Sequence, residues 1–409
     1  MNKIIWISAA VLSVAACAKN EVIPVNSGEN QEITFNVAPK TKADPAPDPE
    51  PDPEPKPEPK PKKEAFSTNN VFASWAYYLP TGTDWDQKSD NPKEETYPKE
   101  YISGAEIAYR EKTEGSAEKV WKAEKTYYWP KNGSLTFFAY SLNKGNLKLN
   151  EAAASMVMCD PFQGIYANID LSVDKNVDFL VADIKADQKA NTTTTGEAGK
   201  YYTDGVPTLF RHRLSYLAFN VKTDQDYSAA GKKLELKSIT FNNISSYGEY
   251  RQFATEIAGQ TYPSGFRAAD ATGTVSYTRI PTTESPFTME IKSSNTGSGV
   301  LVSDTDNSLY IPQTFAENAT IEVVYTITTK VLNSDDVVET VKKTIKLKEL
   351  FPKTYDTVDH TKVISEGWEM GKKYTINLTF TLNEILWDPA VQDWEDVNIG
   401  TDTKPIIVG

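Results

Sequence analysis

The sequence has 409 residues, of which 39% are hydrophobic and 11% aromatic, and it carries a formal net charge of −13. This length exceeds one ordinary domain, and we infer two units that each bury a core. The acidic excess argues against a nucleic-acid backbone as the partner and favours a soluble surface.

The first 17 residues have the layout of an export signal. Lys3 supplies a positive charge, residues 4–12 form an apolar stretch, and small residues at 14–16 precede Cys17. The stretch is too short for a membrane-spanning helix. Because the cysteine follows the small residues directly, the site resembles a bacterial lipobox, whose thiol receives diacylglycerol. The sequence predicts a lipoprotein anchored to the outer membrane through Cys17, and the alternative is an ordinary secretory signal with an incidental cysteine.

A short strand stands alone near the N-terminus. Ile33, Phe35 and Val37 alternate with polar residues, which is typical of a half-buried strand that needs a sheet to join. From residue 44 to residue 63 proline then occupies every odd position from 45 to 61. Alternating prolines remove every second backbone donor and favour polyproline II. This stretch is either a plain spacer or an accessible loop that a protease can cut.

The chain beyond this spacer has the pattern of antiparallel β-structure. Strands are expected at residues 71–78, 126–130, 135–140 and 177–183, with a turn containing Asn132 and Gly133 joining the second to the third. A short helix is expected at residues 151–158. The polar stretch 185–205 lacks apolar periodicity and marks a boundary.

The second half continues the same pattern. Apolar residues alternate within 217–221, 321–327 and 374–382, and these faces favour a sandwich. The change of phase between Leu236 and Ile239 predicts a β-bulge. The last segment, 389–409, is polar with an apolar end and is expected to be frayed.

The fold class is therefore all-β, with two tandem antiparallel β-sandwich domains after an export signal and a proline-rich acidic spacer. In chain order the predicted division is signal 1–17, tether and first strand 18–43, spacer 44–63, N-terminal sandwich 64–205, and C-terminal sandwich with the tail of the chain 206–409.

The sequence gives no support for catalysis, a metal or a cofactor. The two histidines, His212 and His360, have no second ligand at metal-binding spacing. With Cys17 lipidated, Cys159 is left without a partner, which excludes an intramolecular disulfide. Phosphate loops, nucleophile elbows and zinc-protease motifs are absent from the sequence. Four aromatic residues could stack on sugar rings if they were exposed, although in β-rich domains such residues are more often core: Trp75, Tyr77, Tyr127 and Trp129.

The order of these motifs resembles that of the fimbrillin family of Bacteroidetes, the lipoprotein-derived subunits of type V pili. The resemblance rests on the following stretches: Cys17 in its lipobox, 33–43, 127–140, 178–182, 209–221 and 371–394. It implies two transthyretin-like sandwiches, export, lipidation and proteolytic removal of the first strand. The groove then accepts a strand from the C-terminal tail of a neighbouring subunit. The leaving strand would carry Ile33, Phe35 and Val37, and the incoming tail would carry Ile406, Ile407 and Val408.

One departure from the family pattern concerns processing. Well-known members resemble substrates of an arginine-directed protease, but the first arginine of this chain is Arg110. The candidate cleavage residues are therefore lysines: Lys40, Lys42, Lys60, Lys62 and Lys63. An uncut subunit would keep its lipid and serve as an anchor, whereas a cut one would enter the shaft. The predicted function is a fimbrial subunit at the cell surface, with other pilins and a host or glycan receptor as partners; the alternative is a glycan-binding or adhesive lipoprotein that does not polymerise.

Overall fold

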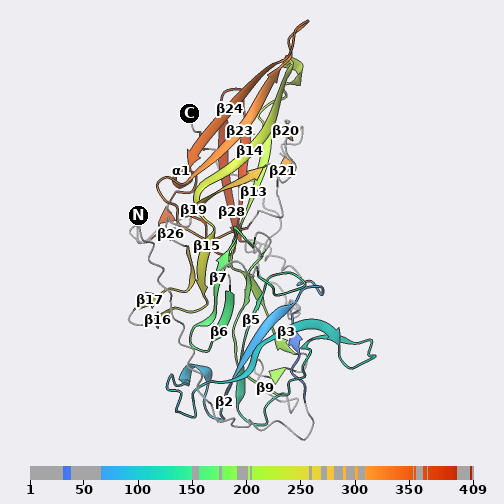
Figure 1. The fold of residues 1–409 in the computed structure, drawn as a ribbon, viewed down its shortest axis with the longest axis vertical. Coiled ribbons are helices and arrows are strands. Elements are labelled where there is room, and N and C mark those ends of the chain that lie inside the picture. Colours follow the sequence, from blue (N-terminus) through green and yellow to red (C-terminus); the bar gives the residue numbers. More distant parts are fainter. Residues whose placement is uncertain are drawn as a thin grey trace, which may run out of the picture.

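The computed structural model describes residues 31–37, 66–149, 156–174, 177–190, 201–202, 205–257, 260–268, 274–280, 289–291, 300–302, 309–352, 354–355, 363–365, 367–393 and 406–407. Nearly all of its regular structure is β, as expected, and the strands form four large sheets along an elongated molecule (Figure 1). Three short helical turns accompany them: η1 (Trp85–Gln87), η2 (Ser228–Ala230) and α1 (Leu347–Leu350).

Sheet I has ten strands and contains the N-terminal strand. Its main path runs β10 (Tyr201–Tyr202), β9 (Lys185–Ala190), β5 (Ser134–Ser141), β2 (Phe72–Leu79), β3 (Lys99–Glu111), β4 (Lys119–Ala123), β1 (Phe35–Asn36), β11 (Val206–Pro207). β8 (Leu180–Ala182) pairs with β5 and with β12 (Phe210–His212). Strand β5 is buried on both faces, because its odd and even residues enter two different cores.

Sheet II covers one face of sheet I. It runs β18 (Gly265–Ala268), β15 (Tyr247–Arg251), β7 (Gly164–Asp170), β6 (Met156–Asp160), and the two-stranded hairpin of β16 (Thr255–Ile257) and β17 (Gln260–Tyr262) follows β15 in the chain. The core between sheets I and II contains Phe138 and Tyr140 from β5 and Ile165, Ala167 and Ile169 from β7. These alternating residues make a two-layer sandwich.

Sheets III and IV form the second sandwich. Sheet III runs β21 (Val300–Val302), β13 (Ser215–Thr223), β27 (Lys372–Phe380), β28 (Ile385–Asp393), β29 (Ile406–Ile407), with β22 (Leu309–Tyr310) also on β13. Sheet IV runs β19 (Thr274–Ile280), β14 (Lys232–Ser245), β23 (Thr320–Thr329), β24 (Val337–Lys346), with β20 (Met289–Ile291) on β14. A small separate pair joins β25 (Thr354–Tyr355) to β26 (Val363–Ser365). One core lies between the two sheets, and β13, β14, β23 and β27 contribute more than half of its residues.

Several sequence predictions about these strands are confirmed. Strands occupy the expected segments around 71–78, 135–140, 217–221, 321–327 and 374–382. The predicted bulge is present, because the register of β14 against β23 shifts between Leu236 and Ser238. This shift lets Leu234, Leu236, Ile239 and Phe241 enter the same core despite their change of phase.

Other predictions about local structure were wrong. Residues 126–130 do not form a hairpin with β5; instead Tyr128 makes an antiparallel bridge with Glu32. Residues 156–158 belong to strand β6 rather than to a helix, and 150–155 lie outside the described residues. The first residues of the boundary stretch 185–205, which lacks apolar periodicity, form strand β9. Residues 389–393, expected to fray, end strand β28. Tyr128 and strand β9 pair with segments far along the chain, whereas β6 and β28 each pair with the neighbouring strand of a hairpin. In all of these cases strand pairing overrode the local pattern.

Strands from both sides of the predicted division after residue 205 pair with each other. β12 lies beside β8, and β15 lies beside β7. Sheets I and II are therefore completed by residues from beyond that point. The division into 64–205 and 206–409 stays a prediction.

Candidate functional site

The N-terminal strand occupies an interior position of sheet I, between β4 and β11. Phe35 pairs with Trp121 of β4 in antiparallel register and with Val206 of β11 in parallel register. The isolated strand that the sequence indicated thus finds its sheet in the first sandwich, and we call the position it fills the β1 slot.

Backbone hydrogen bonds hold the strand on both sides. Toward β4, the Ile33 N–H donates to the Tyr127 carbonyl oxygen at 2.8 Å, and the Trp129 N–H donates to the Gln31 carbonyl oxygen at 3.0 Å. Toward β11, the Val206 N–H donates to the Thr34 carbonyl oxygen at 2.8 Å and the Thr208 N–H donates to that of Asn36 at 2.9 Å. Removing β1 would leave these donors and acceptors without their partners.

The alternating side chains of this strand are buried. Ile33, Phe35 and Val37 are 3%, 5% and 8% exposed. The Phe35 ring makes edge contacts with Phe72 and Phe137, at centroid distances of 5.4 and 5.8 Å. Burying three such side chains contributes at most roughly 5–9 kcal/mol. This is comparable with the whole stability of a typical domain, about 5–15 kcal/mol, so the slot needs an occupant.

The chain re-enters the same core after the spacer. Phe66 stacks on Phe210 at 5.0 Å and contacts Trp121 at 5.4 Å, and both Phe66 and Phe35 contact Phe72. The connection 38–65 therefore begins and ends at one core, although its own residues lie outside the described part. Only this connection joins β1 covalently to the rest of the sheet.

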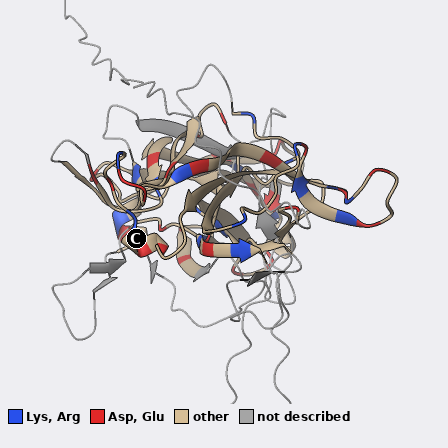
Figure 2. Ribbon diagram, turned by 90° about the horizontal axis from the view of Figure 1, so that it is seen from below, with Lys and Arg blue, Asp and Glu red and all other residues tan. Residues whose placement is uncertain are grey.

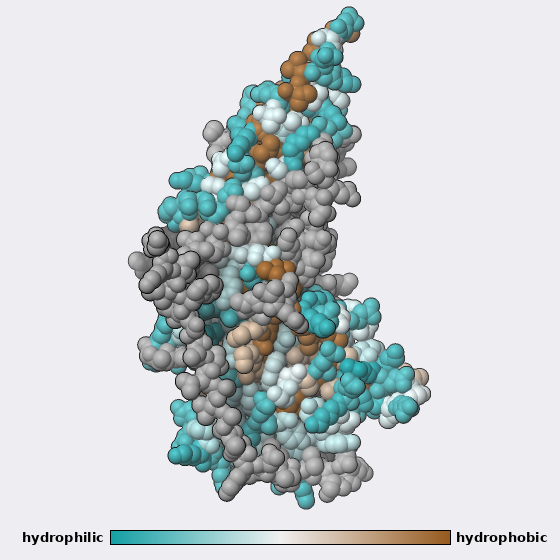
Figure 3. Space-filling view, viewed as in Figure 1, coloured by the Kyte–Doolittle hydropathy of each residue, from teal (hydrophilic) through white to brown (hydrophobic). Residues whose placement is uncertain are grey.

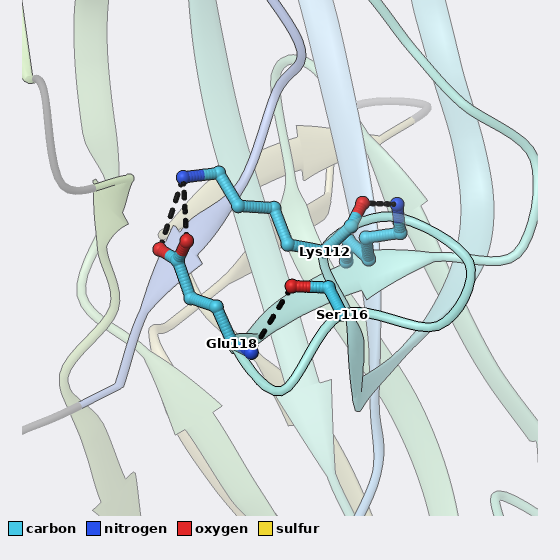
Figure 4. Close-up of polar contacts among 4 residues, drawn as sticks. Lys112, Ser116 and Glu118 are labelled. Atoms are coloured by element: carbon cyan, nitrogen blue, oxygen red, sulfur yellow. Dashed lines mark hydrogen bonds and ion pairs between the residues drawn. The ribbon is translucent and has the colours of Figure 1, made fainter.

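A projecting hairpin arm adjoins the slot, because β4 lies between β3 and β1. Figure 2 shows acidic and basic residues together along this arm. At its tip the Lys112 ammonium lies 2.9 Å from a Glu118 carboxylate oxygen, and the Glu118 N–H donates to the Ser116 hydroxyl at 3.1 Å (Figure 4). Nearer the slot, Lys122 pairs with Glu32 at 3.0 Å, which adds a charge contact to the backbone pairing.

The tail residues lie on the second sandwich. Ile406 and Ile407 form β29, which pairs with Trp387 and Leu386 of β28 at the edge of sheet III. Val408 lies outside the described residues, as do Cys17 and the five candidate lysines, Lys40, Lys42, Lys60, Lys62 and Lys63. The structure thus brings together Ile33, Phe35 and Val37 and places part of the tail on a different sheet.

The aromatic residues considered for sugar stacking do not form an exposed row. Tyr77 and Trp129 are buried, while Trp75 and Tyr127 are half-buried. The Tyr77 hydroxyl donates to the Cys159 carbonyl oxygen at 3.2 Å, and Trp75 stacks on Tyr140 at 5.8 Å. These contacts are those of core residues.

The two histidines were the residues considered as possible metal ligands. His212 lies in β12 with its Nδ1 3.0 Å from an Asp178 oxygen, and His360 lies outside the described residues. Within the described ranges no group of three His, Cys, Asp or Glu residues could hold a metal ion. In that same part of the chain no helix is long and apolar enough to cross a membrane.

Sequence reasoning missed the walls of the slot. Trp121, Val206 and Gly205 lie in short strands or turns without clear alternation, so no local signal marks them. The slot is made of segments far apart in the sequence, and only the tertiary fold brings them together.

The fold and site define an all-β protein whose first strand fills an interior slot and is tied to it by one long connection. A sequence model of the fimbrillin-like family matches residues 81–394, and the chain belongs to this family. No curated protein sequence matches it.

One solved structure supports the fold. A fimbrial protein from Bacteroides vulgatus superposes with a TM-score of 0.52 at 16% identity, covering 79% of this chain and 92% of that one. A candidate cell adhesion protein from Bacteroides uniformis gives 0.41 at 11% identity, covering 89% and 99%. The tip fimbrial protein Mfa3 from Porphyromonas gingivalis gives 0.27 at 13% identity, covering 80% and 94%. Only the first similarity is strong enough to support the fold.

Proposed function

We propose that this protein is a structural, non-catalytic subunit of a cell-surface fimbria that assembles by strand exchange at the β1 slot. The observation that carries the proposal is the position of β1: it is interior to the sheet and buried, yet covalently joined only through the connection 38–65. Family membership supports the fimbrial assignment.

Exchange is physically reasonable because the slot offers the same bonds to any suitable strand. The Trp129, Val206 and Thr208 N–H groups and the Tyr127 carbonyl point at the strand in the slot. An incoming strand with apolar residues at alternate positions would restore these hydrogen bonds and bury the exposed core. The tail of a second copy is the proposed donor, with Ile406, Ile407 and Val408 as its apolar residues.

The donor would have to leave its own sheet first. Within the described part of the tail, β29 pairs with β28 through Ile406 and Ile407. The slot offers a longer, two-sided set of partners. The two-sided backbone partners of the slot support transfer of the tail from β28 to the empty slot of a second copy.

Export and processing complete the proposal. Lipidation at Cys17 would hold the subunit at the outer membrane, and cleavage after one of the candidate lysines would release β1 together with the lipid. A cut subunit would enter the shaft, and an uncut one would remain as the anchor. The glycan-binding alternative is not favoured, because Tyr77 and Trp129 are buried.

The test uses the chain with a specific protease site inserted in the spacer. We expect the intact protein to stay monomeric and the cut protein to form a ladder of polymers that resists mild detergent. Removing residues 394–409 should abolish the ladder but leave the cut monomer folded. A cut, full-length protein that keeps β1 bound and never polymerises, even with excess tail peptide, would refute strand exchange.

A further inference from the structure

A strip of tyrosine and arginine side chains crosses the outer face of sheet II. Tyr166 of β7 and Arg251 of β15 are register partners, and the Arg251 guanidinium lies over the Tyr166 ring at 6.0 Å. The same guanidinium lies 4.4 Å from the centre of the Tyr262 ring on β17, and Arg267 of β18 lies 5.7 Å from that ring. We call Tyr166, Arg251, Tyr262 and Arg267 the Tyr/Arg strip.

The positive charge of this strip is only partly neutralised. Arg267 pairs with Glu249 at 3.3 Å. Arg251 donates to the amide oxygen of Gln163 at 2.5 Å, and among the described residues no Asp or Glu oxygen lies within ion-pair distance of it. A guanidinium that lies over aromatic rings is weakly hydrated and partly ordered by them, so it can bind a carboxylate at little entropic cost. None of the four side chains is buried.

The chain itself contains a segment with matching chemistry. Residues 44–54 carry five acidic side chains, no lysine and a proline at every second position. Proline-rich segments in the polyproline II conformation bind to surfaces lined with aromatic rings, and neighbouring charges choose among such ligands. The tyrosine rings of the strip can contact the prolines of such a ligand, and the arginines can pair with its acidic side chains.

The connection can extend far from the core at which it begins and ends. Residues 38–65 leave and return to one core, and 28 residues in extended form span roughly 85 Å, or about 40 Å out and back. A unit of about 200 residues has a diameter on the order of 40 Å. The spacer can therefore cross a large part of the surface of the first sandwich.

We propose that the Tyr/Arg strip binds the acidic half of the spacer of its own chain, residues 44–54. The inference does not depend on strand exchange, since it concerns a binding face on sheet II and not the β1 slot.

The first experiment titrates labelled peptides into a full chain whose residues 44–63 are replaced by a glycine and serine linker of equal length. We expect the 44–54 peptide to bind with a dissociation constant in the micromolar range, and to bind severalfold more weakly at high salt. The 55–63 peptide has the same proline alternation and a net positive charge, and it should not bind. Equal binding of both peptides would overturn the role of charge. A 44–54 peptide whose prolines are changed to alanine should bind more weakly than the unmodified peptide. The same affinity for both would overturn the role of the prolines.

Variants then locate the site. Arg251→Gln and Tyr262→Ala should each weaken binding of the 44–54 peptide at least fivefold, while leaving the thermal unfolding midpoint within a few degrees. Arg110→Gln removes the same charge from β3 in sheet I and serves as the matched control, with unchanged binding expected. Unchanged affinity in the Arg251→Gln and Tyr262→Ala variants would place the peptide elsewhere and refute the proposal.

A final comparison tests binding within the chain. In the native sequence the tethered spacer competes at an effective concentration near the millimolar range, so added peptide should bind at least tenfold more weakly than to the linker-replaced chain. The same affinity for both proteins would show that the native spacer does not occupy the strip. Failure of strand exchange in the polymerisation test would leave all these outcomes unaffected.

Discussion

Gly205 lies against the backbone of Phe35, so that a Cβ on Gly205 would come within 2.8 Å of the Phe35 carbonyl carbon and 2.9 Å of its nitrogen. Gly205 also has a φ of +94°, in the region that favours glycine. It directly precedes β11, which receives the strand in parallel register. The absence of a side chain is thus what allows β1 to approach β11.

The first prediction follows from this contact. Gly205→Ala should destabilise the protein by about 2–4 kcal/mol, because it adds a backbone clash to the cost of a positive φ. Gly265→Ala is the matched control: its φ is also +94°, but nothing lies within 4 Å of the added Cβ. We expect this control to cost only about 1 kcal/mol. Urea unfolding of both variants measures the difference, and equal losses would show that the approach to Phe35 is not what restricts residue 205.

A second prediction concerns the ring of Phe35. Phe35→Ala should lower the free energy of unfolding of the first sandwich by about 3–5 kcal/mol, because it leaves a cavity between Phe72 and Phe137. Phe66→Ala should cost less, because Phe66 is only half-buried in the same cluster. Fluorescence-monitored urea unfolding can rank the two variants. A smaller loss for Phe35→Ala than for Phe66→Ala would mean that β1 contributes little to the core.

Sequence reasoning predicted those elements whose own residues carry the signal. The alternation of residues 374–382 and 321–327 indicated the strands β27 and β23, and the isolated strand at 33–37 was recognised as needing a sheet. Each of these strands has one buried apolar face and one polar face, so apolar and polar residues alternate clearly along its sequence. The fimbrillin family was also recognised from the order of its motifs, and the family match confirms it.

Several of the elements that were missed depend at least in part on partners far along the chain. Strand β4 is only five residues long and gains its place from β3 and β1, while β11 has two residues, one of which is a proline. The segment 126–130 has the pattern of a strand, but its Tyr128 bridges the N-terminal segment and not the adjacent β5. Pairing choices of this kind are made by long-range packing, which a single sequence does not display. The residues that line the slot could therefore not be named in advance, although its occupant could.

A third prediction concerns the apolar tip of the β23–β24 hairpin. Figure 3 shows apolar atoms at this end of the molecule, and Leu332, Val337 and Val338 are 90%, 58% and 59% exposed. Because Leu332 buries little surface, Leu332→Ser should change the free energy of unfolding by less than about 0.5 kcal/mol. Ile327→Ser, farther down β23 and buried at 5% exposure, should cost about 2 kcal/mol or more, because it removes apolar contacts and buries a hydroxyl. Chemical denaturation checks both, and a large loss for Leu332→Ser would indicate a contact that the monomer does not show.

The last prediction concerns alkaline pH. Burial raises the pKa of Tyr140 to about 12, and it raises the pKa of Tyr250 to about 12 despite the nearby Arg213, which acts in the opposite direction. In the unfolded chain a tyrosine loses its proton near pH 10. The raised pKa values therefore contribute to the free energy of unfolding fully below about pH 10, where both states are protonated. This contribution is lost progressively between about pH 10 and pH 12, where the tyrosines of the unfolded chain ionise and those of the folded protein do not.

The urea midpoint should thus fall steeply as the pH rises from about 9 to about 11.5. Tyr140→Phe should flatten this fall, because the variant has one fewer group that ionises on unfolding. Its midpoint at neutral pH, where the hydroxyl is protonated in both states, reports any loss of packing separately. If the tyrosinate absorbance of the native protein rose before unfolding and the slope were the same in Tyr140→Phe, the ring would be ionising in place and its burial would not govern the alkaline transition.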